Sequence, residues 1–227
     1  MPDSDIPFEP GSYWTPKRAR DALVAMIASR DSPEMQAMME TVAAAGAADA
    51  DPAAAMALLV GEGARPRASA GVIRRESCVF RRGRAGDLPT LVLLIAAGEL
   101  PPLFLEPFVD GFLVVEHQDR IVGAGGVEMY GEDAVIRSVV VDAEARGLGL
   151  GLEIARLLDE DARASGARNV FLFSLHAWRF WLRLGYDELP LDQWPEPVRE
   201  NWQYQFVARF PEASRDVHAM VKRADPR

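Results

Sequence analysis

Cysteine is almost absent from this chain, since Cys78 is the only one among its 227 residues. One cysteine excludes an internal disulfide and any multi-cysteine metal site, and it is typical of a protein from a reducing compartment. Long apolar runs are also missing, because no stretch approaches the roughly 18 residues of a membrane-spanning helix. The first ten residues are acidic and contain proline, unlike a secretory signal. We therefore expect a cytoplasmic protein without a membrane partner.

Histidine and basic charge are scarce as well. The three histidines, His117, His176 and His218, lack the paired spacing of metal ligands, so no metal site is predicted. Lysine and arginine number 25 against 34 acidic residues, a net charge of −9, which argues against non-specific binding to nucleic acid. The chain does contain 49% hydrophobic and 26% charged residues, which are the proportions of a globular protein.

The composition changes near residue 70 and divides the chain in two. Residues 1–72 are rich in alanine and methionine, and three times a capping residue is followed by proline, the pattern that begins a helix. We expect a small helical extension that ends in a linker, followed by the main domain at 73–227. The predicted helices of the extension cover about 15–29, 33–45 and 52–60.

In the main domain, stretches typical of strands alternate with amphipathic stretches. This order favours an α/β fold of the α+β kind, with a mixed and mostly antiparallel sheet flanked by helices. The run 134–142 is apolar at nearly every position, as expected of a central strand that is covered on both faces. The other predicted strands lie near 77–82, 112–115, 121–129, 169–174 and 217–222. The predicted helices begin at 87 and lie near 103–109, 148–165, 177–184 and 196–206.

The strongest chemical signal is the glycine-rich turn Arg146–Gly151, which joins the run 134–142 to an amphipathic helix. Glycine lets the backbone turn sharply and approach a ligand closely. The helix start offers unpaired amides and a partial positive charge, and Arg146 adds a full charge, so a phosphate fits there. Two alternatives are a tight connection without a ligand and a dinucleotide-binding turn. The G-x-G-x-G spacing and the preceding hairpins disfavour the second.

Two segments resemble a known family. The segment VVVDAEARGLGLGLEIARLL resembles the signature of the GNAT acetyltransferase superfamily, Q/R-x-x-G-x-G/A, with Arg146, Gly149 and Gly151 at its three defined positions. The segment HAWRFWLRLGY resembles the family's helix after the fifth strand, which ends in a Gly-aromatic pair, here Gly185–Tyr186. The resemblance covers about 77–223. The runs IRSVVVDAEARGLGLG, RFWLRLGY and WPEPVREN are most similar to the branch associated with arsenic-resistance operons and amino-acid acetylation.

The resemblance implies that acetyl-coenzyme A (acetyl-CoA) is the cosubstrate and that an amine attacks its thioester directly. The amides of the turn would hold the pyrophosphate, and backbone groups of the preceding strand would pair with the pantetheine arm. The oxyanion donor would be the amide of Val139 or Val140. The implied coenzyme-binding residues are Val139, Val140, Val141, Arg146, Gly147, Leu148, Gly149, Leu150, Gly151 and Leu152.

The acid and the base are where this chain departs from the family pattern. Many relatives carry a tyrosine four residues before the glycine of the Gly-aromatic pair, and here that position is Trp181. An indole N–H is too weak an acid to protonate a thiolate. The catalytic candidates are therefore Glu128, His176 and Tyr186. The candidates for binding the substrate are Arg137, Ser174 and Trp181.

Arg137 stands in a strand that otherwise reads valine and isoleucine, where an unpaired guanidinium would be costly to bury. Strand alternation places it on the same face as Val135, Val139 and Val141. One interpretation is an ion pair with a neighbouring carboxylate such as Glu128. The other is a fork that binds the carboxylate of an amino-acid-like substrate.

Taken together, the sequence predicts an acetyl-CoA-dependent N-acetyltransferase that acts on the amine of a small molecule, such as an amino acid. The alternative is a non-catalytic acyl-CoA sensor whose helical extension reports occupancy to a partner. A homodimer is left open. The sequence does not identify the acceptor amine or the role of residues 1–72.

Overall fold

The computed structural model describes residues 72–98, 100–102, 104–209, 211 and 214–224. The three helices predicted for the N-terminal extension lie outside the described residues. Among the described helices, none combines the length and apolar character needed to cross a membrane.

A seven-stranded mixed sheet forms the centre of the domain, with the strand order β1-β2-β3-β4-β5-β7-β6. Only β4 and β5 pair in parallel; every other neighbouring pair is antiparallel. This is the mixed and mostly antiparallel sheet that the sequence predicted. The strands are β1 Val79–Arg82, β2 Phe112–His117, β3 Arg120–Tyr130, β4 Asp133–Val141, β5 Asn169–Ser174, β6 Asp187–Glu188 and β7 His218–Arg223.

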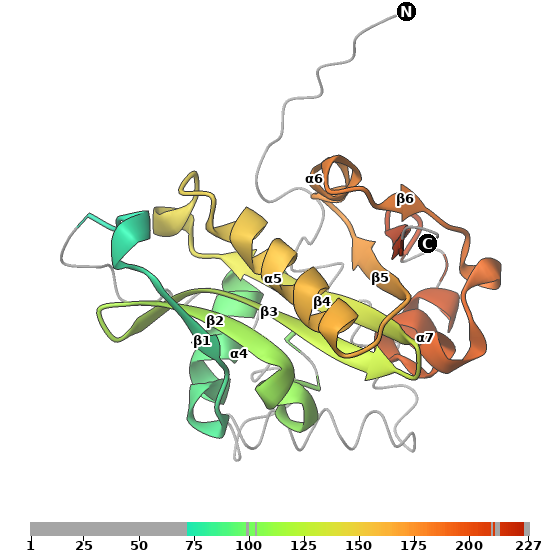
Figure 1. The fold of residues 1–227 in the computed structure, drawn as a ribbon, viewed down its shortest axis with the longest axis horizontal. Helices are drawn as coiled ribbons and strands as arrows, with labels where there is room; N and C mark the ends of the chain where they lie inside the picture. Colours follow the sequence, from blue (N-terminus) through green and yellow to red (C-terminus); the bar gives the residue numbers. More distant parts are fainter. Residues whose placement is uncertain (1–71, 99, 103, 210, 212–213, 225–227) are drawn as a thin grey trace, which may run out of the picture.

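Helices cover both faces of the sheet (Figure 1). The amphipathic helix α5 packs its apolar side on one face, in a core that also holds Trp181 and Tyr186. Helix α4 is apolar nearly throughout and packs on the other face, against β2, β3 and β4. The α-helices are α4 Leu88–Ala97, α5 Leu150–Ala164, α6 Trp178–Arg183 and α7 Trp202–Arg209.

Two predicted elements differ from the structure, and one observed strand was not predicted. The helix predicted at 103–109 is a 3-10 helix over Glu106–Gly111. The helix predicted at 196–206 is divided at Asn201, with a 3-10 helix over Glu196–Glu200 before it and α7 after it. The sequence analysis missed the two-residue strand β6, which is too short to show an alternating pattern.

A β-bulge interrupts the central strand β4. The register shifts by one residue between Ala124 and Gly126 of β3, so Ser138 and Val139 of β4 together oppose a single residue. Ser138 adopts a positive φ of 54°, a conformation that costs an L-residue about 1–2 kcal/mol.

The bulge reverses the alternation predicted for Arg137. An extra residue moves every later side chain to the opposite face. Val139 and Val141 accordingly pack in the core beneath α5. Arg137 lies on the opposite face, with Val135. The prediction that Arg137 shares a face with Val139 and Val141 is therefore wrong, because simple alternation ignores a bulge.

The parallel strands β4 and β5 separate after a short paired stretch. Their register runs from Asp133↔Asn169 to Ile136↔Leu172 and stops there, although β4 continues to Val141 and β5 to Ser174. The C-terminal half of β4 therefore has no strand partner on its β5 side among the described residues. The two open strand ends lie at the same edge of the sheet as the turn that leads into α5.

Candidate functional site

The glycine-rich turn forms an open helix start. Gly147 and Gly149 have φ values of +80° and +74°, which L side chains rarely adopt. Gly149 is the N-cap of α5 and supplies no side-chain acceptor to the first amides of the helix. A Cβ atom at Gly147 would meet nothing within 4 Å. The arrangement fits an anion at the start of α5.

Two arginines border this turn. Arg146 Nε donates a hydrogen bond to the carbonyl of Val141, at 3.2 Å. Arg75 Nη1 donates to the carbonyl of Leu148, at 3.3 Å, and its Nη2 lies 3.5 Å from Glu153 Oε2. Arg75 precedes Leu148 by 73 positions, so no local sequence pattern could have placed it here.

The opposite face of the sheet holds a fully buried ion pair. Arg137 Nη1 lies 2.8 Å from Glu128 Oε1, and the two side chains are 0% and 1% exposed. The same nitrogen donates to the carbonyl of Phe104, at 3.2 Å. Burial lowers the pKa of the Arg137 guanidinium, and the Glu128 carboxylate beside it opposes that shift. The ion pair that the sequence analysis offered for Arg137 is thus confirmed.

The second carboxylate oxygen of Glu128 is also engaged. It accepts hydrogen bonds from the hydroxyl of Tyr130, at 2.7 Å, and from Nδ2 of Asn201, at 2.9 Å. Burial, followed by the neighbouring carboxylate, raises the pKa of Tyr130. Both oxygens of Glu128 therefore have donors, and the side chain is 1% exposed, so an amine could reach it only if the surrounding network opened.

The C-terminal segment completes this network. Asn201 is fully buried, and its Oδ1 accepts from the amides of Gln203 and Tyr204 at the start of α7. The ring of Trp202 lies 5.1 Å from the guanidinium carbon of Arg137. Sequence reasoning missed Asn201 and Trp202 as site residues. The available signal was an asparagine at a helix start, which indicates a cap and says nothing of its partner 73 positions away.

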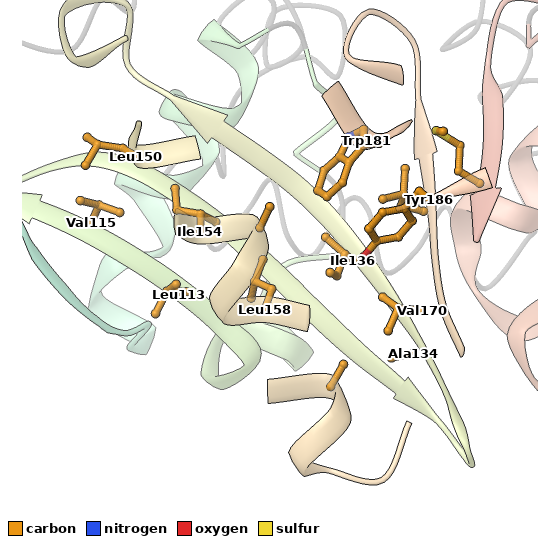
Figure 2. Packing of buried hydrophobic residues seen from close by; sticks show 14 of the residues in the cluster. Leu113, Val115, Ala134, Ile136, Leu150, Ile154, Leu158, Val170, Trp181 and Tyr186 are labelled. Atoms are coloured by element: carbon orange, nitrogen blue, oxygen red, sulfur yellow. The ribbon is translucent and has the colours of Figure 1, made fainter. Parts of the chain in front are cut away.

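Tyr186 lies inside the core beneath α5 and not at the surface of the site. Figure 2 shows its ring among Trp181, Ile136 and Val170. It is 2% exposed, and its hydroxyl has no hydrogen-bond partner among the described residues. Burial, with the charge of Asp159 adding to it, raises the pKa of this hydroxyl. The charge of Arg163 opposes this rise in pKa but does not cancel it, so the geometry does not support Tyr186 as the acid.

The structure separates the other predicted residues between the two faces. Ser174 ends β5, at the open side of the β4–β5 pair, and Trp181 packs on the α5 face of the sheet. His176 is exposed and lies two residues before α6, in the connection from β5. Glu128 and Arg137 are on the opposite face. Among the described residues, no group of three or more His, Cys, Asp or Glu side chains could hold a metal ion.

Comparison with known sequences identifies the central part of the chain. Residues 93–186 match the Acetyltransferase (GNAT) family. The amino-acid acetyltransferase of Ralstonia nicotianae is 28% identical over 135 residues, which represent 55% of this chain and 30% of that protein. The match therefore spans less than a third of the length of that relative.

Solved structures share the fold. N-acetylglutamate synthase from Neisseria gonorrhoeae, complexed with coenzyme A and N-acetyl-glutamate, has a TM-score of 0.56 at 20% identity, over 66% of this chain and 35% of that one. Rv2747 from Mycobacterium tuberculosis, in complex with CoA and NLQ, has a TM-score of 0.56 at 23% identity, over 65% of this chain and 99% of that one. The architecture of the described domain is thus found in proteins that have been solved with coenzyme A.

Proposed function

We propose that this chain is an acetyl-CoA-dependent N-acetyltransferase that acts on the amine of a small molecule, because residues 93–186 match the Acetyltransferase (GNAT) family. One observation carries the proposal. The half of β4 that has no described strand partner on its β5 side and the open start of α5 meet at the same edge of the sheet. An elongated ligand with a phosphate at one end and amide groups along its length fits both features.

The residues present fit coenzyme A. The amides from Gly147 to Leu152, together with Arg146, would bind its pyrophosphate. The backbone of Val139–Val141 would pair with the pantetheine amides as an added strand, once Arg146 releases the carbonyl of Val141. The coenzyme supplies the activated acetyl group as a thioester. The amide of Val139 or Val140, beside the bulge, would stabilise the oxyanion that forms when the amine attacks.

An amino acid is the acceptor class that we propose. The relative with 28% identity is an amino-acid acetyltransferase, and the structural neighbour from Neisseria gonorrhoeae was solved with N-acetyl-glutamate. Arg137 would bind the acceptor carboxylate if its pair with Glu128 opens, because a guanidinium fork matches a carboxylate. Ser174, Trp181 and His176 remain predicted site residues, and Glu128 remains the predicted base.

Calorimetric titration with acetyl-CoA tests the coenzyme site. Gly149→Glu places a carboxylate where we place the pyrophosphate, and we expect it to abolish binding. Gly131→Glu is the control for the backbone effect, since Gly131 also has a positive φ, of 67°, but it lies in the turn between β3 and β4. A Cβ at Gly149 would meet only the flexible end of Arg75, at 2.8 Å from Nη1, and a Cβ at Gly131 would meet nothing within 4 Å. Equal binding by wild type and Gly149→Glu would contradict the proposed site.

A second candidate function, an acyl-CoA sensor without turnover, is favoured by two observations. Both oxygens of Glu128 are engaged, and the hydroxyl of Tyr186 is enclosed in the core. Release of free coenzyme thiol, measured against a panel of amino acids and simple amines, separates the two functions. Binding of acetyl-CoA without thiol release for any amine would favour the sensor.

A further inference from the structure

Three polar side chains lie side by side on adjacent strands. Ser174 of β5 is directly opposite His218 of β7, and Glu188 of β6 is opposite Met220 of β7. Residues that face each other across antiparallel strands share a face. Met220 packs in the core beneath α5, so Ser174, His218 and Glu188 all lie on the α5 face of the sheet.

The imidazole of His218 is held in a fixed orientation. Its Nδ1 lies 2.5 Å from Glu188 Oε1, and its ring stacks on Trp178 of α6 at 4.8 Å between centroids and 21° between planes. A carboxylate at one ring nitrogen stabilises the imidazolium and orients the other nitrogen. Strands β5 and β6 lie on opposite sides of β7. Because Nδ1 of His218 is directed to Glu188 on the β6 side, its Nε2 is directed to the β5 side, where Ser174 lies.

The hydroxyl of Ser174 is available and well placed. It donates no side-chain hydrogen bond to any of the described residues. Ser174 is a cross-strand neighbour of His218, and a hydrogen bond between the two side chains is part of the proposal below. The β4–β5 register ends at Ile136↔Leu172. Two residues further along, β4 reaches the bulge residue Ser138 and β5 reaches Ser174, so these two residues are at the same height along the strands. Ser174 therefore faces the gap between the open ends of β4 and β5, where the proposed function places the reactive end of the coenzyme.

We propose that Ser174, His218 and Glu188 form a proton relay to the departing thiolate of coenzyme A. The relay rests on the proposed acetyltransferase function. When the amine has attacked the thioester carbon and the C–S bond breaks, the sulfur takes the proton of the Ser174 hydroxyl. Ser174 takes a proton from Nε2 of the His218 imidazolium, which Glu188 stabilises. His218 regains its proton from water, and the proton of the attacking amine is released to water, so the charges balance.

The relay fills a role for which Trp181, Tyr186 and Glu128 are poorly suited. Trp181 replaces the family's tyrosine, and the Tyr186 hydroxyl is enclosed in the core. Glu128 lies on the opposite face of the sheet, in its pair with Arg137. Glu188 of β6 is the carboxylate that contacts His218, and Arg179 of α6 lies over the Trp178 ring, with 4.9 Å between its guanidinium carbon and the ring centroid. Ser174 on the β5 side carries no charge.

Steady-state kinetics with the best amine of the panel test the relay. His218→Gln and Ser174→Ala are each expected to lower kcat about 100-fold, the lower end for general acid catalysis, with the KM for acetyl-CoA within about 2-fold of wild type. Glu188→Gln, an exposed site where folding is not at risk, lowers kcat about 10-fold.

Asp187→Asn is the matched control. Asp187 adjoins Glu188 and, by strand alternation, points to the opposite face, so the variant should keep the wild-type kcat. Wild-type kcat in both His218→Gln and Glu188→Gln would overturn the relay and leave the acetyltransferase function standing. If wild type binds acetyl-CoA but acetylates no amine, the acetyltransferase function fails and the relay with it.

Discussion

Replacing Arg137 by methionine is expected to lower the free energy of unfolding by about 3–5 kcal/mol, the range for removing one partner of a buried ion pair. The Arg137 and Glu128 side chains are 0% and 1% exposed, with 2.8 Å between Nη1 and Oε1. Without the guanidinium, the Glu128 carboxylate keeps only two neutral donors, from Tyr130 and Asn201. These donors do not compensate for a negative charge that is held away from water.

The magnitude follows from the contacts of the guanidinium. Two unit charges about 4 Å apart attract each other by about 4 kcal/mol at an effective dielectric constant of 20. The hydrogen bond to the Phe104 carbonyl adds about 1 kcal/mol, and the cation–π contact with Trp202 adds about 1–2 kcal/mol. Part of this stabilising free energy is offset, because burying the guanidinium of Arg137 costs more free energy than burying the thioether of the methionine that replaces it. The net loss in the free energy of unfolding is therefore about 3–5 kcal/mol.

The double variant provides the sharper test. Glu128→Gln preserves an acceptor for Tyr130 and Asn201 but leaves the Arg137 charge uncompensated, so it should lose a similar amount of stability. The double variant Glu128→Gln/Arg137→Met buries no charge here. We expect it to be more stable than Arg137→Met by about 2 kcal/mol, since the two sites are directly coupled.

Urea unfolding, followed by circular dichroism and tryptophan fluorescence, measures these differences at constant m-value. Arg156→Met is the control, because Arg156 pairs with Glu153 and Glu160 on the exposed side of α5 and should give no measurable change. Additive losses in the double variant would refute the reasoning, because they would show that the two buried charges do not stabilise each other.

Three further predictions concern single positions. Ser138→Gly should raise the free energy of unfolding by about 1 kcal/mol in urea titrations, because glycine adopts the φ of 54° without strain; a loss would show that the side chain of Ser138 is needed. Tyr186→Phe should raise Tm by about 3 °C in calorimetry, because it removes a buried hydroxyl without a partner; a lower Tm would reveal a hidden partner such as water. The hydrogen bond from Arg81 lowers the pKa of Asp87 in the folded protein, so its stabilisation is present above its unfolded value of about 3.9 and is lost as the pH falls. The Tm of Asp87→Asn should therefore fall less than that of wild type between about pH 5 and pH 2, and parallel curves would contradict this.

The sequence by itself determined the elements whose pattern is local. The periodicity of 148–165 and the glycines before it predicted α5 and its open start, and the apolar run 134–142 predicted the central strand β4. These features could be predicted because each residue's preference is set by neighbours a few positions away. Local patterns also marked the turn that we propose as the coenzyme site, and they supplied Arg137 and Glu128 as candidates for one ion pair.

Only the tertiary structure decided how the site is assembled. The bulge at Ser138 set the face on which Arg137 lies, and it depends on the register with β3, which no single strand encodes. The enclosure of Glu128 by Asn201, and the alignment of Ser174 with His218, join positions that are 73 and 44 residues apart. Such contacts depend on how the strands are ordered in the sheet and on where the C-terminal segment packs. The physical reason is that burial, charge pairing and proton transfer act over a few ångströms in space, whatever the distance along the chain.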